Sequence, residues 1–199
     1  SHSPCPPATR AIPHDMMSLK THAAEFPIRI LEPCTGFFGG RYLFQTSVAT
    51  PAGEVVAAPY GVRGEGYALH INGATFASAK IESGTGFFRG NGLFSTSAAT
   101  PAGAVVASPD NAGYALRIDG ATFAAVKIGD GTFSGEDIFS TSALTPAGDV
   151  IAAPSSAKFA LRIDGATFAA AKIGDGTGFF SKAFSFFLTS IVGNVFYRW

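Results

Sequence analysis

The chain has 199 residues, which is long enough for one domain or a short row of repeats around a hydrophobic core. Charged residues make up 14% of it, against roughly 25% in typical soluble domains, while hydrophobic residues make up 47%. The 14 basic and 14 acidic residues cancel, which argues against nucleic acid or an anionic membrane as a partner. Low charge leaves little repulsion between copies, so we expect the chain to bind itself, as a homopolymer or a homotrimer.

The first part of the chain, residues 1–33, is predicted to be an N-terminal extension or arm. It is rich in proline up to Pro13, and its last stretch, Phe26–Leu31, alternates like a strand. Pro27 predicts an edge position for this strand, because a missing N–H is tolerated there. We therefore expect a docking strand that makes assembly contacts through Phe26, Ile28, Ile30 and Leu31.

The only two cysteines, Cys5 and Cys34, bracket this arm. A disulfide between them would close a loop of about 30 residues and stabilise the chain by ~3 kcal/mol. Both lie beside proline and outside the repeats, which favours an exposed disulfide. Two unrelated thiols are the alternative.

Residues 34–199 are predicted to form a domain of tandem repeats. Thr-Gly-Phe-Phe occurs at Thr35, Thr85 and Thr177, and Thr-Pro-Ala-Gly occurs at Thr50, Thr100 and Thr145. These landmarks recur every 45 to 50 residues, which is the repeat scale of propellers, trefoils and arrays. We divide the domain into three full repeats and a truncated fourth, at about 35–83, 84–130, 131–175 and 176–199.

Each repeat is predicted to contain two antiparallel hairpins. In the second repeat, Thr-Pro-Ala-Gly joins strands at 93–99 and 104–108, and Asp119-Gly120 joins strands at 114–118 and 121–128. Asp-Gly favours a two-residue type I′ turn, because such a turn needs positive φ at both central residues. The predicted fold class is all-β, with repeats stacked as in a fibre. Closure into a β-trefoil or a propeller is the alternative.

Both faces of each sheet are predicted to be covered. A two-residue turn places Tyr114, Leu116, Ile118 and Phe123 on one face, which is an apolar core. The opposite face carries alanine and other small residues, where a sheet with one solvated face would be polar. Small side chains let another sheet approach closely, so we expect a neighbouring sheet on that face.

The last stretch, residues 183–197, carries no charge and is rich in phenylalanine. It matches the first half of a repeat, and it is short for a membrane span, which needs about 20 residues. We predict a truncated repeat and no membrane span. A half repeat leaves an unpaired strand edge, to which the docking strand could bind. We expect this open edge at Phe184, Phe186, Leu188, Ile191 and Val195.

No cluster of residues predicts a catalytic, cofactor or metal site. The four histidines lack metal-ligand spacing, and the chain has no nucleophile elbow or phosphate-binding glycine loop. His70 occupies the slot of Arg117 and Arg162, and is interpreted as a polar residue of the repeat face. Asp130 and Asp175 could hold Ca²⁺ between repeats, but the first repeat lacks an aspartate there.

Two sets of repeated polar residues remain. Lysines recur near the end of each repeat and predict a solubilising edge ladder, with a binding stripe as the alternative: Lys80, Lys127 and Lys172. Threonines that begin each Thr-Pro-Ala-Gly are candidate O-glycan sites as well as turn residues: Thr50, Thr100 and Thr145.

The segment Gly-Tyr-Ala-Leu-Arg-Ile-Asp-Gly-Ala-Thr-Phe, residues 113–123, resembles a phrase of bacterial and phage fibre repeats. The resemblance implies an extracellular fibre, secreted or on a virion surface. We therefore expect a structural subunit of a self-assembling filament, joined by pairing of the arm with the open terminal repeat. A carbohydrate-binding (lectin-like) or receptor-binding fibre module, with glycans as partners, is the alternative, and an enzyme is not expected.

Overall fold

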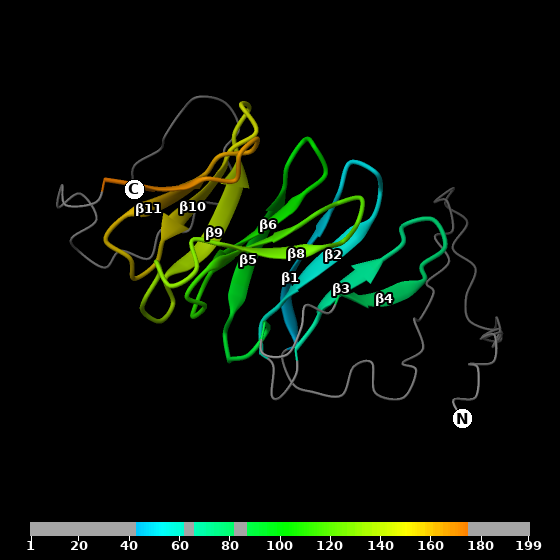
Figure 1. The fold of residues 1–199 in the computed structure, drawn as a ribbon, viewed down its shortest axis with the longest axis horizontal. Helices are drawn as coiled ribbons and strands as arrows, with labels where there is room; N and C mark the ends of the chain where they lie inside the picture. The colour runs from blue at the N-terminus through cyan, green and yellow to red at the C-terminus, as the bar shows by residue number, and fades with distance from the viewer. Residues whose placement is uncertain (1–42, 62–65, 82–86, 175–199) are drawn as a thin grey trace, which may run out of the picture. The chain divides into compact units, whose positions relative to one another are not determined.

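The computed structural model describes residues 43–61, 66–81 and 87–174. Within these ranges the chain forms twelve β-strands and no helix, which confirms the all-β prediction (Figure 1). In chain order the strands are β1 (Phe44–Ala49), β2 (Val55–Pro59), β3 (Ala68–Ile71), β4 (Ser78–Ile81), β5 (Phe94–Ala99), β6 (Val105–Pro109), β7 (Ala115–Ile118), β8 (Ala125–Ile128), β9 (Phe139–Leu144), β10 (Val150–Pro154), β11 (Ala160–Ile163) and β12 (Ala170–Ile173).

The strands form three antiparallel sheets, each made by one repeat. Sheet 1 has the order β1-β2-β3-β4, sheet 2 the order β5-β6-β7-β8, and sheet 3 the order β9-β10-β11-β12. Every described strand pairs within its own repeat, so this part of the chain does not form the barrel that the β-trefoil alternative requires. The repeat predicted from the sequence is therefore one four-stranded sheet.

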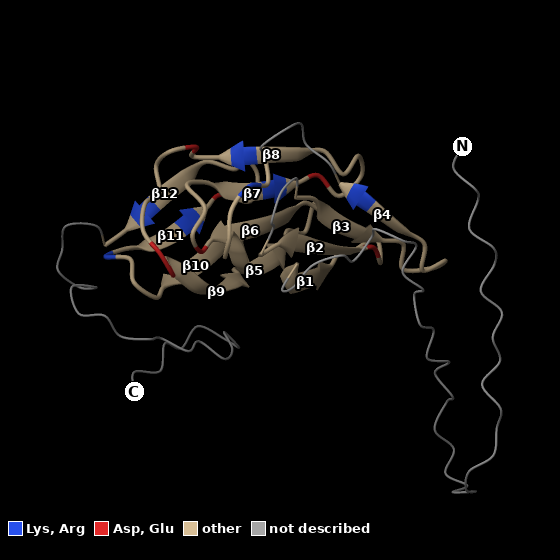
Figure 2. Ribbon diagram, turned by 90° about the horizontal axis from the view of Figure 1, so that it is seen from below, with Lys and Arg blue, Asp and Glu red and all other residues tan. Residues whose placement is uncertain are grey.

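The three sheets stand side by side with their first strands adjacent. Figure 2 shows the first strands, β1, β5 and β9, along one side of the three sheets, and the last strands, β4, β8 and β12, along the opposite side. Hydroxyl groups join the first strands, because Thr46 Oγ1 lies 2.6 Å from Ser97 Oγ and Thr96 Oγ1 lies 2.8 Å from Ser142 Oγ. Successive blades of a β-propeller are arranged in this way.

Neighbouring sheets pack large side chains against small ones. On one face of sheet 2, Leu116 and Ile118 pack in a buried cluster with Val56 of sheet 1. On the other face, Ala115 packs in a second cluster that contains Leu161 of sheet 3. Small residues on that face let the backbones of two sheets approach, and apolar surface is removed from water on both sides. The prediction that both faces are covered is confirmed for sheet 2.

The predicted two-residue turn between the third and fourth strands is wrong. Ile118 pairs with Ala125 instead of Ala121, so residues 119–124 form a longer loop. The cause is the side chain of Asp119, whose Oδ1 accepts hydrogen bonds from the backbone N–H groups of Ala121 (3.1 Å) and Thr122 (2.9 Å). Aspartate often folds the following backbone in this way, in competition with strand pairing.

The two turns of each repeat meet through a pair of glycines. A Cβ built on Gly120 would overlap the carbonyl oxygen of Gly103, the last residue of Thr-Pro-Ala-Gly. The same overlap occurs between Gly73 and Gly53 in sheet 1, and between Gly165 and Gly148 in sheet 3. The Asp-Gly or Asn-Gly turn therefore needs glycine because the Thr-Pro-Ala-Gly turn of the same repeat lies against it.

Replacing Gly120 by alanine is expected to lower the free energy of unfolding by about 1 to 3 kcal/mol, because the turn backbone must move to admit the methyl group. Gly113→Ala is the matched control, since a Cβ there makes only an ordinary contact 3.6 Å from the carbonyl oxygen of Phe133. Urea denaturation of both variants measures the difference. Equal stability of the two variants would contradict the close approach of the turns.

Several predictions from the sequence fall on residues outside the described ranges. These are the disulfide between Cys5 and Cys34, the docking strand Phe26–Leu31, and the open edge at 184–195. They stay predictions. In the part of the chain that the structure describes, no helix is long and apolar enough to cross a membrane.

Candidate functional site: a groove between sheets 2 and 3

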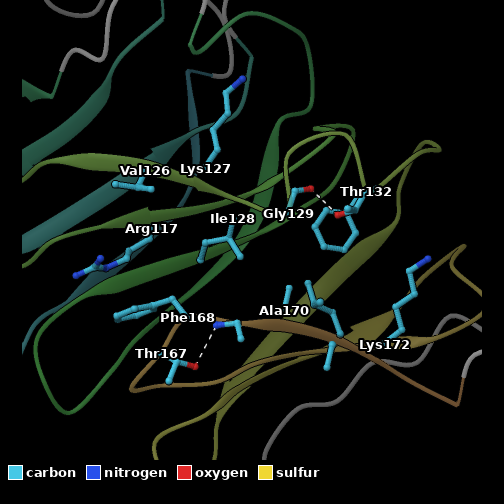
Figure 3. Close-up of a pocket in the computed structure, with 14 residues that line it drawn as sticks. Arg117, Val126, Lys127, Ile128, Gly129, Thr132, Thr167, Phe168, Ala170 and Lys172 are labelled. Carbon is cyan, nitrogen blue, oxygen red and sulfur yellow. Dashed lines mark hydrogen bonds between the residues drawn. The ribbon is translucent and has the colours of Figure 1, made fainter.

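A groove of about 530 Å³ lies between sheets 2 and 3, along β8 and β12 (Figure 3). Its polar lining includes the cationic side chains of Arg117, Lys127 and Lys172, and its described lining contains no aspartate or glutamate. Apolar side chains make up much of the rest, including Val126, which is 48% exposed, and Phe168. The groove therefore combines apolar walls with positive charge.

Arg117 is one of the three cationic residues that line this groove. Its guanidinium carbon lies 4.0 Å from the ring centroid of Phe168, a cation–π contact between sheet 2 and sheet 3. One terminal nitrogen lies 3.2 Å from Asp119 Oδ2. Its Nε, by contrast, is buried and has no hydrogen-bond partner in the described part of the chain. A buried N–H without an acceptor is costly, and native proteins rarely leave one unpaired.

Comparison of the three repeats explains the unpaired Nε. In sheet 3, Arg162 donates from Nε to Asp149 Oδ2 at 2.8 Å, and in sheet 1 His70 Nε2 lies 2.6 Å from Glu54 Oε2. In sheet 2 the equivalent position, directly before β6, is occupied by Ala104. Arg117 therefore lacks the carboxylate that its two counterparts have.

The ring of Phe168 is held over Arg117 by a strained turn. Phe168 has a φ of 58°, a left-handed conformation that is unusual for a bulky residue. Asp164 fixes this turn: its Oδ1 accepts the backbone N–H of Thr167 at 2.8 Å, and its backbone carbonyl accepts the N–H of Phe168 at 2.9 Å. The hydrogen bond from Thr167 is also the main reason why the pKa of Asp164 lies below its usual value.

Each repeated lysine stacks on an aromatic ring of its own sheet. The Nζ of Lys127 lies 4.5 Å from the ring centroid of Tyr114, and the Nζ of Lys172 lies 4.6 Å from that of Phe159. Lys127 also lies 3.5 Å from Asp130. Lysine occupies the outermost strand of all three sheets, β4, β8 and β12, in Figure 2. These contacts hold the ammonium groups at the rim of the groove.

A smaller cavity of about 320 Å³ occupies the corresponding place between sheets 1 and 2. There the ring of Phe123 stacks on His70 with centroids 3.8 Å apart. His70 is already paired with Glu54, so this cavity has no counterpart of the unpaired Arg117 Nε. A two-residue turn would pair Phe123 with Leu116. In the structure Phe123 does not pair with Leu116, and its ring lies against His70 of the neighbouring sheet.

Other predicted site residues lie away from the groove. The side chain of Thr100 is buried and donates to the carbonyl oxygen of Ala104 at 3.1 Å, and Thr50 and Thr145 accept backbone N–H groups in their own turns. The turn role of these threonines is confirmed, whereas their glycosylation stays a prediction. Among the described residues, no group of three or more His, Cys, Asp or Glu side chains could hold a metal ion.

Sequence reasoning treated Arg117 as an ordinary polar residue of the repeat face and missed the groove. A signal was present, because Ala104 stands where the other repeats have Glu54 and Asp149. Only the structure shows that Arg117 lines a groove and that its Nε is buried there.

Comparisons with known proteins find low similarity. No protein-family model matches the chain, and no curated protein matches it. Hydrazine synthase from Kuenenia stuttgartiensis matches over 66% of this chain and 35% of its own, at 12% identity and a TM-score of 0.49. An auxiliary nutrient binding protein from Bacteroides thetaiotaomicron matches over 65% and 31%, at 13% identity and a TM-score of 0.46.

The extracellular domain of a putative one-component system from the same Bacteroides species matches over 65% of this chain and 16% of its own, at 11% identity and a TM-score of 0.45. The chain thus spans about a third or less of the length of these three proteins. At these TM-scores the similarities assign no function to the chain.

Proposed function

We propose that this chain is a binding module that holds a small organic anion in the groove between sheets 2 and 3. The observation that carries the proposal is the buried Nε–H of Arg117, which has no acceptor among the residues that the structure describes. An anionic oxygen of a ligand would take the place that Asp149 takes beside Arg162. A carboxylate, sulfate or phosphate group has this chemistry.

The rest of the groove supports the same class of ligand. Lys127 and Lys172 add positive charge at its rim, and none of the described residues that line the groove is an aspartate or a glutamate. The exposed Val126 and the ring of Phe168 favour an apolar body attached to the anionic group. A groove of about 530 Å³ also lies within the range of small-molecule sites, roughly 300 to 1,000 Å³.

The test compares naphthoate with naphthamide, which share a ring system and differ in charge. Calorimetric titration of the full chain is expected to show saturable binding of naphthoate, and weaker binding of naphthamide by about tenfold or more. The decisive variant is Ala104→Asp, which gives sheet 2 the carboxylate that sheet 3 carries at Asp149. This carboxylate would pair with Arg117 Nε and compete with the ligand, so naphthoate affinity is expected to fall by about tenfold or more.

Ala102→Asp is the matched control, because it adds the same charge on the exposed part of the same turn and should leave affinity within about twofold of the wild type. Thermal unfolding checks that both variants fold. Equal affinity for naphthoate and naphthamide, or unchanged affinity in Ala104→Asp, would refute the proposal. Binding of D-glucuronate in the same assay would assign the ligand to acidic sugars, a subset of the glycan partners that the sequence left as an alternative.

The filament hypothesis concerns other surfaces. It depends on pairing between residues 26–31 and residues 184–195, which lie outside the described ranges. A role as a filament subunit and an extracellular location therefore stay predictions, and the groove proposal does not depend on either.

A further inference from the structure

The groove between sheets 2 and 3 has a cationic side chain near each of its two ends. At one end, the guanidinium carbon of Arg117 lies 4.0 Å from the ring centroid of Phe168, in the turn that follows β11. At the other end, the Nζ of Lys172 lies 4.6 Å from the ring centroid of Phe159, directly before β11. The four residues of β11, about 13 Å of extended chain, separate Phe159 from this turn. Figure 3 shows Arg117 and Lys172 on opposite sides of the groove.

The lining between these two cations is apolar. Ile128 of sheet 2 and Ala170 of sheet 3 lie between Arg117 and Lys172 in Figure 3, and the buried Leu161 also lines the groove. Apolar walls favour an apolar ligand surface, so we expect an elongated apolar body to lie along β11. The two ends of such a body point towards the two cations.

Of the two lysines that line the groove, Lys172 has its ammonium group on the groove side. Phe159, on which it stacks, packs against the buried cluster shared by sheets 2 and 3. Lys127 stacks on Tyr114, which belongs to the cluster shared by sheets 1 and 2, so its ammonium group is turned towards sheet 1. An ammonium group has three N–H donors, so Lys172 can bind a ligand oxygen in addition to its contacts within the protein.

We infer that the groove selects an elongated dianion, whose first anionic group binds Arg117 and whose second binds Lys172. The inference rests on the proposed function, because its first anionic group is the one that meets Arg117 Nε. The lysine stem is flexible, so the ammonium group can move along the groove to meet the second anionic group. An aromatic dicarboxylate with its two carboxylates at opposite ends of the ring system has this chemistry.

Three naphthalene acids test this selection in calorimetric titrations of the full chain. Naphthoate has one carboxylate, naphthalene-2,6-dicarboxylate has two at opposite ends, and naphthalene-2,3-dicarboxylate has the same charge on two adjacent carboxylates. The end-to-end dicarboxylate is expected to bind about three- to tenfold more tightly than naphthoate, a moderate gain because Lys172 is exposed and water screens its charge. The adjacent dicarboxylate should bind within about twofold of naphthoate, since its second carboxylate lies far from Lys172.

The variant Lys172→Gln decides whether Lys172 makes the second contact. Glutamine removes the charge, so the ratio between the affinities for the end-to-end dicarboxylate and for naphthoate should fall to about one. Lys80→Gln is the matched control, because Lys80 holds the same place in β4 of sheet 1 and lines the other cavity. It should leave the ratio unchanged. Thermal unfolding checks that both variants fold.

The proposed function and this inference fail in different ways. If naphthoate does not bind, or binds no more tightly than naphthamide, the anion site at Arg117 is wrong and so is the inference. If naphthoate binds as proposed and the end-to-end dicarboxylate binds no more tightly, the anion site stands and the inference is overturned. A gain that persists in Lys172→Gln, or that the adjacent dicarboxylate shows equally, would overturn it as well.

Discussion

Replacing Phe94 by alanine is expected to lower the free energy of unfolding by about 3 to 5 kcal/mol. Phe94 opens β5, the first strand of the middle sheet, and its side chain is 0% exposed. Its ring packs edge-to-face with Tyr114, with centroids 5.6 Å apart, in the cluster shared by sheets 1 and 2. Alanine removes the ring and leaves a cavity that two rigid sheets cannot close.

Val126→Ala is the control for this substitution. Val126 is 48% exposed, so its truncation should change stability by less than about 0.5 kcal/mol. Equilibrium denaturation in urea measures both variants, with far-ultraviolet circular dichroism as the signal. If Phe94→Ala were as stable as Val126→Ala, the middle sheet could not be packed as described.

Replacing Asp110 by asparagine is expected to stabilise the protein at neutral pH. Asp110 follows β6, is only 4% exposed, and has a pKa raised to about 6, mainly by burial and then by the negative charge of Asp137. A rise from 3.8 to about 6 corresponds to about 3 kcal/mol of cost for the charged form. Asparagine keeps the size of the side chain and removes this charge.

The gain should depend on pH in one direction. The folded state holds the proton more tightly than the unfolded state, so this carboxyl makes its most favourable contribution to stability below pH 3.8. That contribution is lost as the pH rises to about 6 and beyond. Asp110→Asn should therefore exceed the wild type by up to about 3 kcal/mol at neutral pH, and by less than about 1 kcal/mol near pH 4.

Asp137→Asn is the comparison variant. Asp137 is exposed, and its negative charge is the smaller of the two causes that raise the pKa of Asp110. It should give a smaller gain in the same direction. Urea denaturation at the two pH values measures all three proteins. A gain from Asp110→Asn that is equal at both pH values would show that its charge is not the source of the effect.

The repeat and its four strands could be predicted because their signals are local. Thr-Pro-Ala-Gly forms the first turn wherever it occurs, and a threonine hydroxyl completes each copy, as Thr100 does with Ala104. The second turn was misjudged because Asp-Gly suits two kinds of turn. The side chain of Asp119 accepts hydrogen bonds from two backbone N–H groups and so folds residues 119–124 into the longer loop.

The groove could not be predicted from one repeat alone. It depends on Phe168 of one sheet reaching Arg117 of another, and the sequence does not state which sheets are neighbours. What the sequence does contain is the difference between Ala104 and its counterparts Glu54 and Asp149. A departure from an otherwise regular repeat is the signal by which such a site could be found.

The most direct test of the groove is to observe the Arg117 Nε–H itself by nuclear magnetic resonance. The signal is assigned by its loss in Arg117→Lys, and is then followed while naphthoate is added to the full chain. Binding is expected to move this signal downfield and to slow its exchange with water, since the N–H gains a charged acceptor. Naphthamide should move it much less. If naphthoate saturates the protein while the Arg117 Nε–H signal stays unchanged, the anion is bound elsewhere and the central claim is wrong.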